Sequence, residues 1–207
     1  MSEALQRVAR TYLFRIDPMT QLYLIRHGKP AATWGDVDED PGLDDAGRAQ
    51  AEAARDYLMS LPDGLRPTKV VSSPLKRCRE TAMPTSQALG VEIEIDPFVG
   101  EIPTPKALSA EERPAWLREV FGGRWVEAKG DLDYDIWRGQ VAASLVARGG
   151  TAVFSHYVAI NAVMSLLADD DRVLVFRPDH ASISTLHTDG TTLSLVERGR
   201  EATTGVL

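Results

Sequence analysis

The sequence contains a single cysteine, Cys78, among its 207 residues. A lone thiol excludes an intramolecular disulfide, and such a sequence is compatible with a reducing compartment. Because Cys78 falls within an apolar stripe at helical spacing, we expect a small core residue there rather than a reactive thiol. The cysteine content therefore favours a cytoplasmic protein.

Long apolar runs are also missing from the sequence. No segment approaches the roughly 18 apolar residues that a membrane span needs, so we expect no membrane partner. Residues 1–20 contain three arginines but no continuous apolar segment and no small-residue cleavage site, which argues against a secretory signal. We predict an N-terminal extension here, and the sequence leaves open whether it is ordered, disordered or the result of a start codon upstream of Met19.

Basic side chains are not in excess. The chain has 23 Lys and Arg residues against 30 Asp and Glu residues, a net charge of −7. This balance argues against nucleic acid or an anionic membrane as a partner, because both attract basic surfaces. An anionic substrate must then be held by a local cluster of arginines. The length fits a single domain, which we place at residues 21–207.

Two apolar runs are each followed by a histidine. The run at 22–25 leads into Arg26-His27-Gly28, and the run at 151–155 leads into His156. Short apolar runs of this kind are typical of buried strands. In open α/β sheets, ligands bind at the carboxyl ends of the strands. Arg26, His27 and His156 are therefore candidate functional residues.

A third segment, Ser-Ser-Pro-Leu-Lys-Arg at 72–77, follows a short predicted strand. Ser73 is predicted to cap a helix that has Pro74 as its first residue, the preferred place for each residue type. Arg77 would then lie in the first helical turn, where backbone N–H groups and the helix dipole favour an anion. Its planar guanidinium matches phosphate oxygens, so Arg77 is a candidate phosphate ligand.

Strands and helices alternate along the chain, which predicts an α/β fold, a three-layer α/β/α sandwich with a mainly parallel central sheet. Strands are expected at 22–26, 68–72, 91–95, 151–155, 172–176, 182–187 and 192–196. Helices are expected at 44–60, 73–89, 110–120, 133–147 and 157–167. The first helix should have Asp44 as its N-cap and place Ala46, Ala49, Ala53 and Tyr57 on one face.

The three motifs together resemble the histidine phosphatase superfamily, which includes the cofactor-dependent phosphoglycerate mutases and many small phosphatases. They are Arg-His-Gly at 26–28, Ser-Ser-Pro-Leu-Lys-Arg at 72–77 and Ser-His at 155–156. The resemblance covers residues 22 to about 195 in the family's order. It implies a phosphoglycerate mutase-like fold, with an insertion at about 103–130 near the active site.

The resemblance also implies a role for each candidate. His27 would be the nucleophile and would form a phosphohistidine, and an unperturbed histidine is substantially neutral near pH 7. Arg26 and Arg77 would hold the phosphate oxygens, and His156 would bind the phosphoryl group and stabilise the transition state. Glu101 aligns with the family's acidic residue, a general acid toward the leaving group and then a base toward water.

Other carboxylates remain alternatives to Glu101 as the acid. They are Asp36, Asp38 and Glu39 in the loop after Gly28, and Glu111 and Glu112 in the insertion.

The sequence departs from the family pattern around the phosphate-binding residues. Tyr157 stands where the family commonly has glycine, and Asn161 stands where an arginine often follows. Lys29 and Pro30 replace the usual Glu-Thr after Arg-His-Gly, and a tryptophan, Trp34, comes later. We therefore predict an altered pocket rim that includes Lys29, Trp34 and Tyr157.

The leading functional hypothesis is a phosphatase that acts on a small phosphorylated metabolite or a phosphoprotein through His27. A phosphoglycerate mutase-like phosphotransferase is one alternative, although the chain is short for that class. A catalytically weak phosphate-binding module is another. The spacing of His180 and His187 fits no metal site, so we expect both to be structural and expect no metal and no cofactor. A homodimer stays open.

Overall fold

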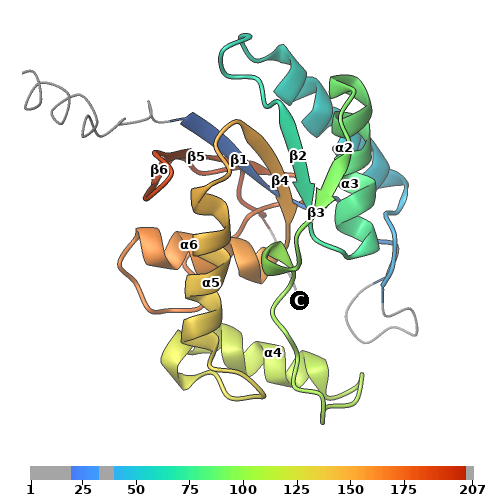
Figure 1. The fold of residues 1–207 in the computed structure, drawn as a ribbon. Helices are drawn as coiled ribbons and strands as arrows, with labels where there is room; N and C mark the ends of the chain where they lie inside the picture. The colour runs from blue at the N-terminus through green and yellow to red at the C-terminus, as the bar shows by residue number, and fades with distance from the viewer. Residues whose placement is uncertain (1–19, 33–39, 204–207) are drawn as a thin grey trace, which may run out of the picture.

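A six-stranded sheet forms the centre of the fold, with strand order β3-β2-β4-β1-β5-β6 (Figure 1). The computed structural model describes residues 20–32 and 40–203. The strands are β1 (Thr20–Arg26), β2 (Lys69–Ser72), β3 (Ile93–Ile95), β4 (Thr151–Ser155), β5 (Ile183–Thr188) and β6 (Leu193–Glu197). Strands β1 to β4 are parallel, and β5 is antiparallel to both β1 and β6. The predicted mainly parallel sheet is confirmed.

Helices cover both faces of the sheet (Figure 1). They are α2 (Asp45–Ser60), α3 (Lys76–Leu89), α4 (Arg113–Gly122), α5 (Tyr134–Val146) and α6 (Tyr157–Leu167). Tyr23 and Ile25 of β1 pack with α2 and α3, whereas Leu22 and Leu24 pack with α5 and α6. Alternate residues of a strand point to opposite faces, so a strand that is apolar on both needs cover on both. The predicted three-layer sandwich is confirmed.

The register of the parallel strands brings the three motifs to one edge. Arg26 of β1 lies opposite Ser155 of β4, and β2 pairs with the other side of β4 in the same direction. The carboxyl ends of the three strands therefore lie level. His27, Ser73 and His156 follow these strands and emerge at the same edge of the sheet.

Helix α2 begins as predicted, because the Asp44 side chain accepts a hydrogen bond from the Gly47 N–H at 2.7 Å. The face that carries Ala46 and Tyr57 is exposed. The buried residues are instead Gly47, Ala51, Ala54 and Leu58. A side chain at position 47 would meet the carbonyl oxygen of Lys29 at 2.1 Å, so this glycine lets the helix approach the loop after β1 closely. That approach decides which face turns inward.

The strand predicted at 172–176 is also wrong. Residues 173–176 form no strand, and Arg172 makes only an isolated bridge with Arg124. The Oδ1 atom of Asn161 accepts the backbone N–H groups of Val175 and Phe176, each at 3.0 Å. A side chain thus takes the place of a neighbouring strand for these buried backbone groups.

The helix predicted from Ser73 begins later than expected. Leu75 occupies the N-cap position, and no side chain caps α3 there. The Ser73 hydroxyl lies instead 2.7 Å from the Nε2 atom of His156. The serine that we expected to cap the helix therefore contacts a candidate functional residue.

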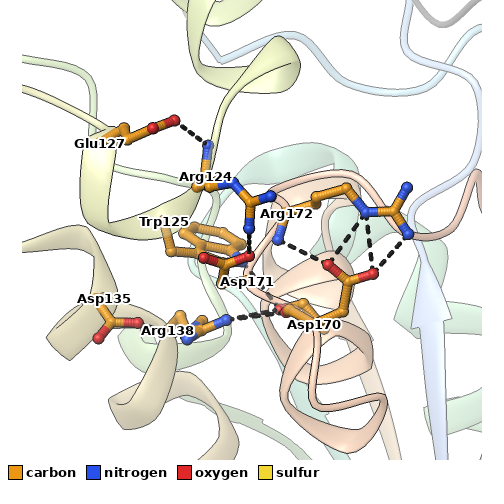
Figure 2. Close-up of polar contacts among 9 residues, drawn as sticks. Arg124, Trp125, Glu127, Asp135, Arg138, Asp170, Asp171 and Arg172 are labelled. Atoms are coloured by element: carbon orange, nitrogen blue, oxygen red, sulfur yellow. Dashed lines mark hydrogen bonds and ion pairs between the residues drawn. The ribbon is translucent and has the colours of Figure 1, made fainter.

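The segment 103–130 contains α4 and a short 3-10 helix, η2 (Trp125–Glu127), both on the α5–α6 side of the sheet (Figure 1). Trp125 is buried, and its indole N–H donates to the Ser165 hydroxyl at 2.9 Å. Figure 2 shows the neighbouring ion pairs, in which Arg124 binds Asp171 and Arg172 binds Asp170. Trp125 therefore anchors this segment to α6.

The N-terminal extension predicted at 1–20, apart from Thr20, lies outside the described residues, as does Trp34. Within the described ranges, no helix is both long and apolar enough to cross a membrane.

We expect Trp125→Ala to lower the free energy of unfolding by about 3–5 kcal/mol, because it leaves a large cavity beneath η2. Trp125→Phe should cost less, mainly the lost hydrogen bond to Ser165, about 1 kcal/mol. Denaturant unfolding with the exposed neighbour variant Val126→Ala as control measures both. Equal stability of Trp125→Ala and Val126→Ala would contradict the anchoring role.

Candidate active site

Three histidine rings gather at the carboxyl edge of the sheet. The ring centres of His27 and His156 are 5.2 Å apart, and those of His27 and His180 are 5.9 Å apart. His27 follows β1, His156 precedes α6, and His180 lies in the loop before β5. The two histidines that the sequence predicts at the ends of buried strands, His27 and His156, therefore lie next to each other in the structure.

The surroundings of His27 fix its tautomer. Its Nδ1–H donates to its neighbour's carbonyl, Gly28 O, at 2.8 Å. Its backbone N–H donates to Ser155 O of β4 at 3.0 Å, which holds the residue against the partner strand. With the ring proton on Nδ1, the Nε2 atom keeps its lone pair. This is the arrangement that a histidine nucleophile needs.

Burial keeps the rings of His27 and His156 neutral. The pKa of His27 lies well below its usual value, first because the ring is buried and then because His156, Arg26 and Arg77 are close. Burial also lowers the pKa of His156, and the two arginines lower it further. Both rings are therefore uncharged near neutral pH.

Arg26 is held on three sides by the protein. Its Nη1 donates to Pro178 O at 2.9 Å, its Nη2 lies 3.0 Å from His180 Nε2, and the Tyr157 ring centre lies 5.0 Å from the guanidinium carbon. Its Nε is buried and has no hydrogen-bond partner. Burial lowers the pKa of Arg26 to about 10, so the side chain stays charged near neutral pH.

The fully buried ring of His156 has one partnered and one unpartnered nitrogen. The Nε2 atom lies 2.7 Å from Ser73 Oγ, whereas the Nδ1 atom has no hydrogen-bond partner. The Nδ1 atom lies 4.0 Å from Glu101 Oε2, beyond hydrogen-bond distance. The site thus contains two buried nitrogens without partners, His156 Nδ1 and Arg26 Nε.

Glu101 reaches the site from the loop after the 3-10 helix η1 (Pro97–Val99). Its Oε1 accepts the backbone N–H groups of Ile102 at 3.0 Å and Val158 at 3.2 Å. Burial raises the pKa of this carboxyl group, which favours its protonated form. The alternative acids Glu111 and Glu112 are exposed, and the alternatives in the loop after Gly28 lie outside the described residues.

Arg77 lies in the first turn of α3, as predicted, and is buried. Its carbonyl oxygen accepts the Thr81 hydroxyl at 2.6 Å, and the Thr81 oxygen accepts the Gly28 N–H at 2.9 Å. This pair of bonds ties the start of α3 to the end of β1. Arg77 Nη1 lies 4.0 Å from Asp40 Oδ1.

The two described residues of the predicted rim take different places. The Lys29 side chain is exposed and pairs with Asp44 at 2.7 Å. Tyr157 is buried against Arg26, with its ring centre 5.9 Å from that of Phe121 in α4. The tyrosine that replaces the family's glycine therefore covers a candidate phosphate ligand.

Sequence reasoning missed His180, which we expected to be merely structural. Its Nε2 atom accepts from Arg26 Nη2, and burial together with Arg26 lowers its pKa to about 4. No motif marks this residue, because its loop reaches the site only through the fold. Among the described residues, no group of three or more His, Cys, Asp or Glu side chains could hold a metal ion.

These lowered histidine pKa values predict that the free energy of unfolding falls as the pH is lowered. Below the unfolded-state pKa of about 6.5, the unfolded chain binds protons at His27, His156 and His180 that the folded protein excludes. Each such proton lowers the free energy of unfolding by about 1.4 kcal/mol for each pH unit below that pKa. The raised pKa of Glu101 acts in the opposite direction, one group against three.

Urea unfolding at about pH 7.5 and about pH 5.5 tests this expectation. The free energy of unfolding should be lower at the acidic pH, and His180→Asn should reduce the difference. A free energy that is equal or higher at the acidic pH would show that the folded protein protonates these rings.

The fold is similar to those of solved phosphatases. A mycobacterial glucosyl-3-phosphoglycerate phosphatase is 20% identical with a TM-score of 0.65, covering 88% of this chain and all (100%) of that one. A phosphoserine phosphatase from Entamoeba histolytica is also 20% identical with a TM-score of 0.65, covering 88% of this chain and 98% of that one. At this identity the likeness shows the fold alone.

A curated relative, a bifunctional protein of Mycobacterium tuberculosis, is 27% identical over 198 residues. The match covers 86% of this chain and 50% of that protein, so the chain spans about half the length of the curated relatives it matches. The model of the histidine phosphatase superfamily (branch 1) matches residues 22–200. The resemblance carried by the three motifs is confirmed, and the chain belongs to the histidine phosphatase superfamily.

Proposed function

We propose that this protein is a phosphatase that hydrolyses a phosphomonoester through a phosphohistidine on His27. One observation carries the proposal. The two buried unpartnered nitrogens, Arg26 Nε and His156 Nδ1, belong to two residues close to a neutral His27. Buried polar groups rarely stay without partners, so unpaired nitrogens in one site indicate a ligand that completes them. A phosphoryl group offers the matching acceptor oxygens.

In the first step, His27 Nε2 attacks the phosphorus atom in line with the ester oxygen. An N–P bond forms and the P–O ester bond breaks. Arg26 and Arg77 face the charge on the phosphoryl oxygens, and His156 Nδ1–H donates to one of them. Glu101, whose raised pKa favours the acid, gives its proton to the leaving oxygen.

In the second step, a water molecule attacks the phosphohistidine. The Glu101 carboxylate takes a proton from this water, the N–P bond breaks and its electron pair returns to Nε2. Inorganic phosphate leaves, and both Glu101 and His27 regain their starting protonation states. The same carboxyl group thus serves as acid and then as base.

Two observations favour turnover over phosphate binding alone. Glu101 is buried within the site rather than on the surface, and the pKa of its carboxyl group is raised. A module that only binds phosphate needs no such acid. The mutase alternative is less favoured because Lys29 and Pro30 stand in place of the family's usual residues after Gly28. The substrate class remains a small phosphorylated metabolite or a phosphoprotein.

We expect the wild-type protein to form a phosphoenzyme that is labile in acid and stable in base, as an N–P bond is. His27→Asn should abolish both the adduct and turnover while leaving the fold intact. Rapid quenching after addition of a labelled phosphomonoester, with EDTA present throughout, measures the adduct. His187→Asn on β5 is the matched control and should behave as wild type, whereas turnover by His27→Asn at the wild-type rate would rule out this mechanism.

Glu101→Gln should slow esters with poor leaving groups far more than esters with good ones. A nitrophenolate leaves without a proton, whereas a sugar alkoxide needs one. The measurement is kcat/KM for both ester types, because this ratio reports the steps through the first irreversible one. Equal losses for the two types would show that Glu101 is not the acid.

A further inference from the structure

The buried hydroxyl of Ser73 has no part in the steps above, yet it makes the shortest polar contact of His156. Ser73 is fully buried where β2 ends. Its Oγ lies 2.7 Å from His156 Nε2 and accepts the backbone N–H of Leu75 at 3.3 Å. Since one lone pair of the oxygen is occupied by Leu75, the hydroxyl proton is available for the imidazole nitrogen.

We propose that Ser73 is a positioning residue that fixes the tautomer of His156. Its hydroxyl donates to Nε2, so the ring proton resides on Nδ1, the nitrogen without a partner in the site. The inference rests on the proposed function, in which Nδ1–H donates to a phosphoryl oxygen. Ser73 acts through His156 and needs no contact with the substrate.

The opposite tautomer leaves the site poorly matched to an anion. With the proton on Nε2, Nδ1 would present a bare lone pair 4.0 Å from Glu101 Oε2. The same lone pair would face the phosphoryl oxygens, and no hydrogen bond could form because both Nδ1 and these oxygens would be acceptors. The Ser73 oxygen would then accept twice, from Leu75 and from Nε2, and its own proton would lose its 2.7 Å partner.

Cys78 is the other side chain that touches Nε2, and it is the weaker candidate. Its Sγ lies 3.3 Å from His156 Nε2 and equally 3.3 Å from Ser155 O. A thiol is a weak donor and a weak acceptor, and the Ser155 carbonyl gives its S–H a partner. The hydroxyl of Ser73 is therefore the group that decides which ring nitrogen carries the proton.

Imidazole ¹⁵N NMR of the resting wild-type protein reads the tautomer directly. We expect His156 Nδ1 to be protonated and Nε2 to be unprotonated. In Ser73→Ala, the Nε2–H form should become populated and kcat/KM should fall about tenfold or more, approaching the roughly 10²–10³ lost when an oxyanion donor is removed. Ser72→Ala is the matched control, because the buried Ser72 hydroxyl donates to Ser73 O and does not contact the ring.

Two results would overturn the role of Ser73. They are a wild-type spectrum with the proton on Nε2, and a Ser73→Ala spectrum in which His156 keeps Nδ1–H throughout. If Ser73→Ala does not fold, Ser73→Cys replaces the hydroxyl with a weaker donor of similar shape and should shift the tautomer in the same direction. The spectrum needs no turnover, so an Nδ1–H tautomer in a protein that forms no phosphohistidine would contradict the proposed function alone.

Discussion

The candidate site depends on the parallel pairing of β1 with β4. This pairing sets Arg26 opposite Ser155, and it continues one residue further through the hydrogen bond from His27 N–H to Ser155 O. The residues that follow the two strands, His27 and His156, therefore lie side by side although 128 residues separate them along the sequence. Buried strands with apolar residues on both faces leave little freedom to change this register, because a slip of one residue would reverse which side chains meet each helical layer. The spacing of the two imidazoles is thus a property of the sheet rather than of the loops around it.

Electrostatics then determines what this arrangement can do. The fold places two guanidinium groups beside two imidazoles in a buried region, and both conditions oppose a charge on the rings. The same burial acts in the opposite direction on Glu101 and favours its protonated form. A single physical cause, removal from water, therefore favours an uncharged His27 ring and a protonated Glu101 carboxyl group in one site, the two states that the proposed reaction needs. The arginines keep their charge, because even the lowered pKa of Arg26, about 10, lies well above neutral pH.

The sequence predicts the parts of this site that are local and misses those that depend on tertiary contacts. The strands that precede His27 and His156 follow from short apolar runs, and the place of Arg77 follows from helix start signals. The role of His180 does not, because its loop is brought to Arg26 only by the antiparallel strand β5. The sequence does not show the buried face of α2 for a related reason: the close approach of Gly47 to Lys29 O sets the rotation of the helix, and the apolar pattern does not contain that contact.

Asn161 shows how a departure from the family pattern can serve the site at a distance. It stands where an arginine often occurs, and its side chain instead binds the backbone of Val175 and Phe176. The chain that leaves this point carries Pro178 O and His180 Nε2, the two acceptors that hold the Arg26 guanidinium. The same loop is held from its other side, since Asp179 N–H donates to Arg200 O at 2.9 Å. Holding both acceptors of one arginine occupies its two terminal nitrogens and leaves Nε as the atom without a partner. The loop therefore determines which nitrogen of Arg26 is left for the phosphoryl group of the proposed reaction.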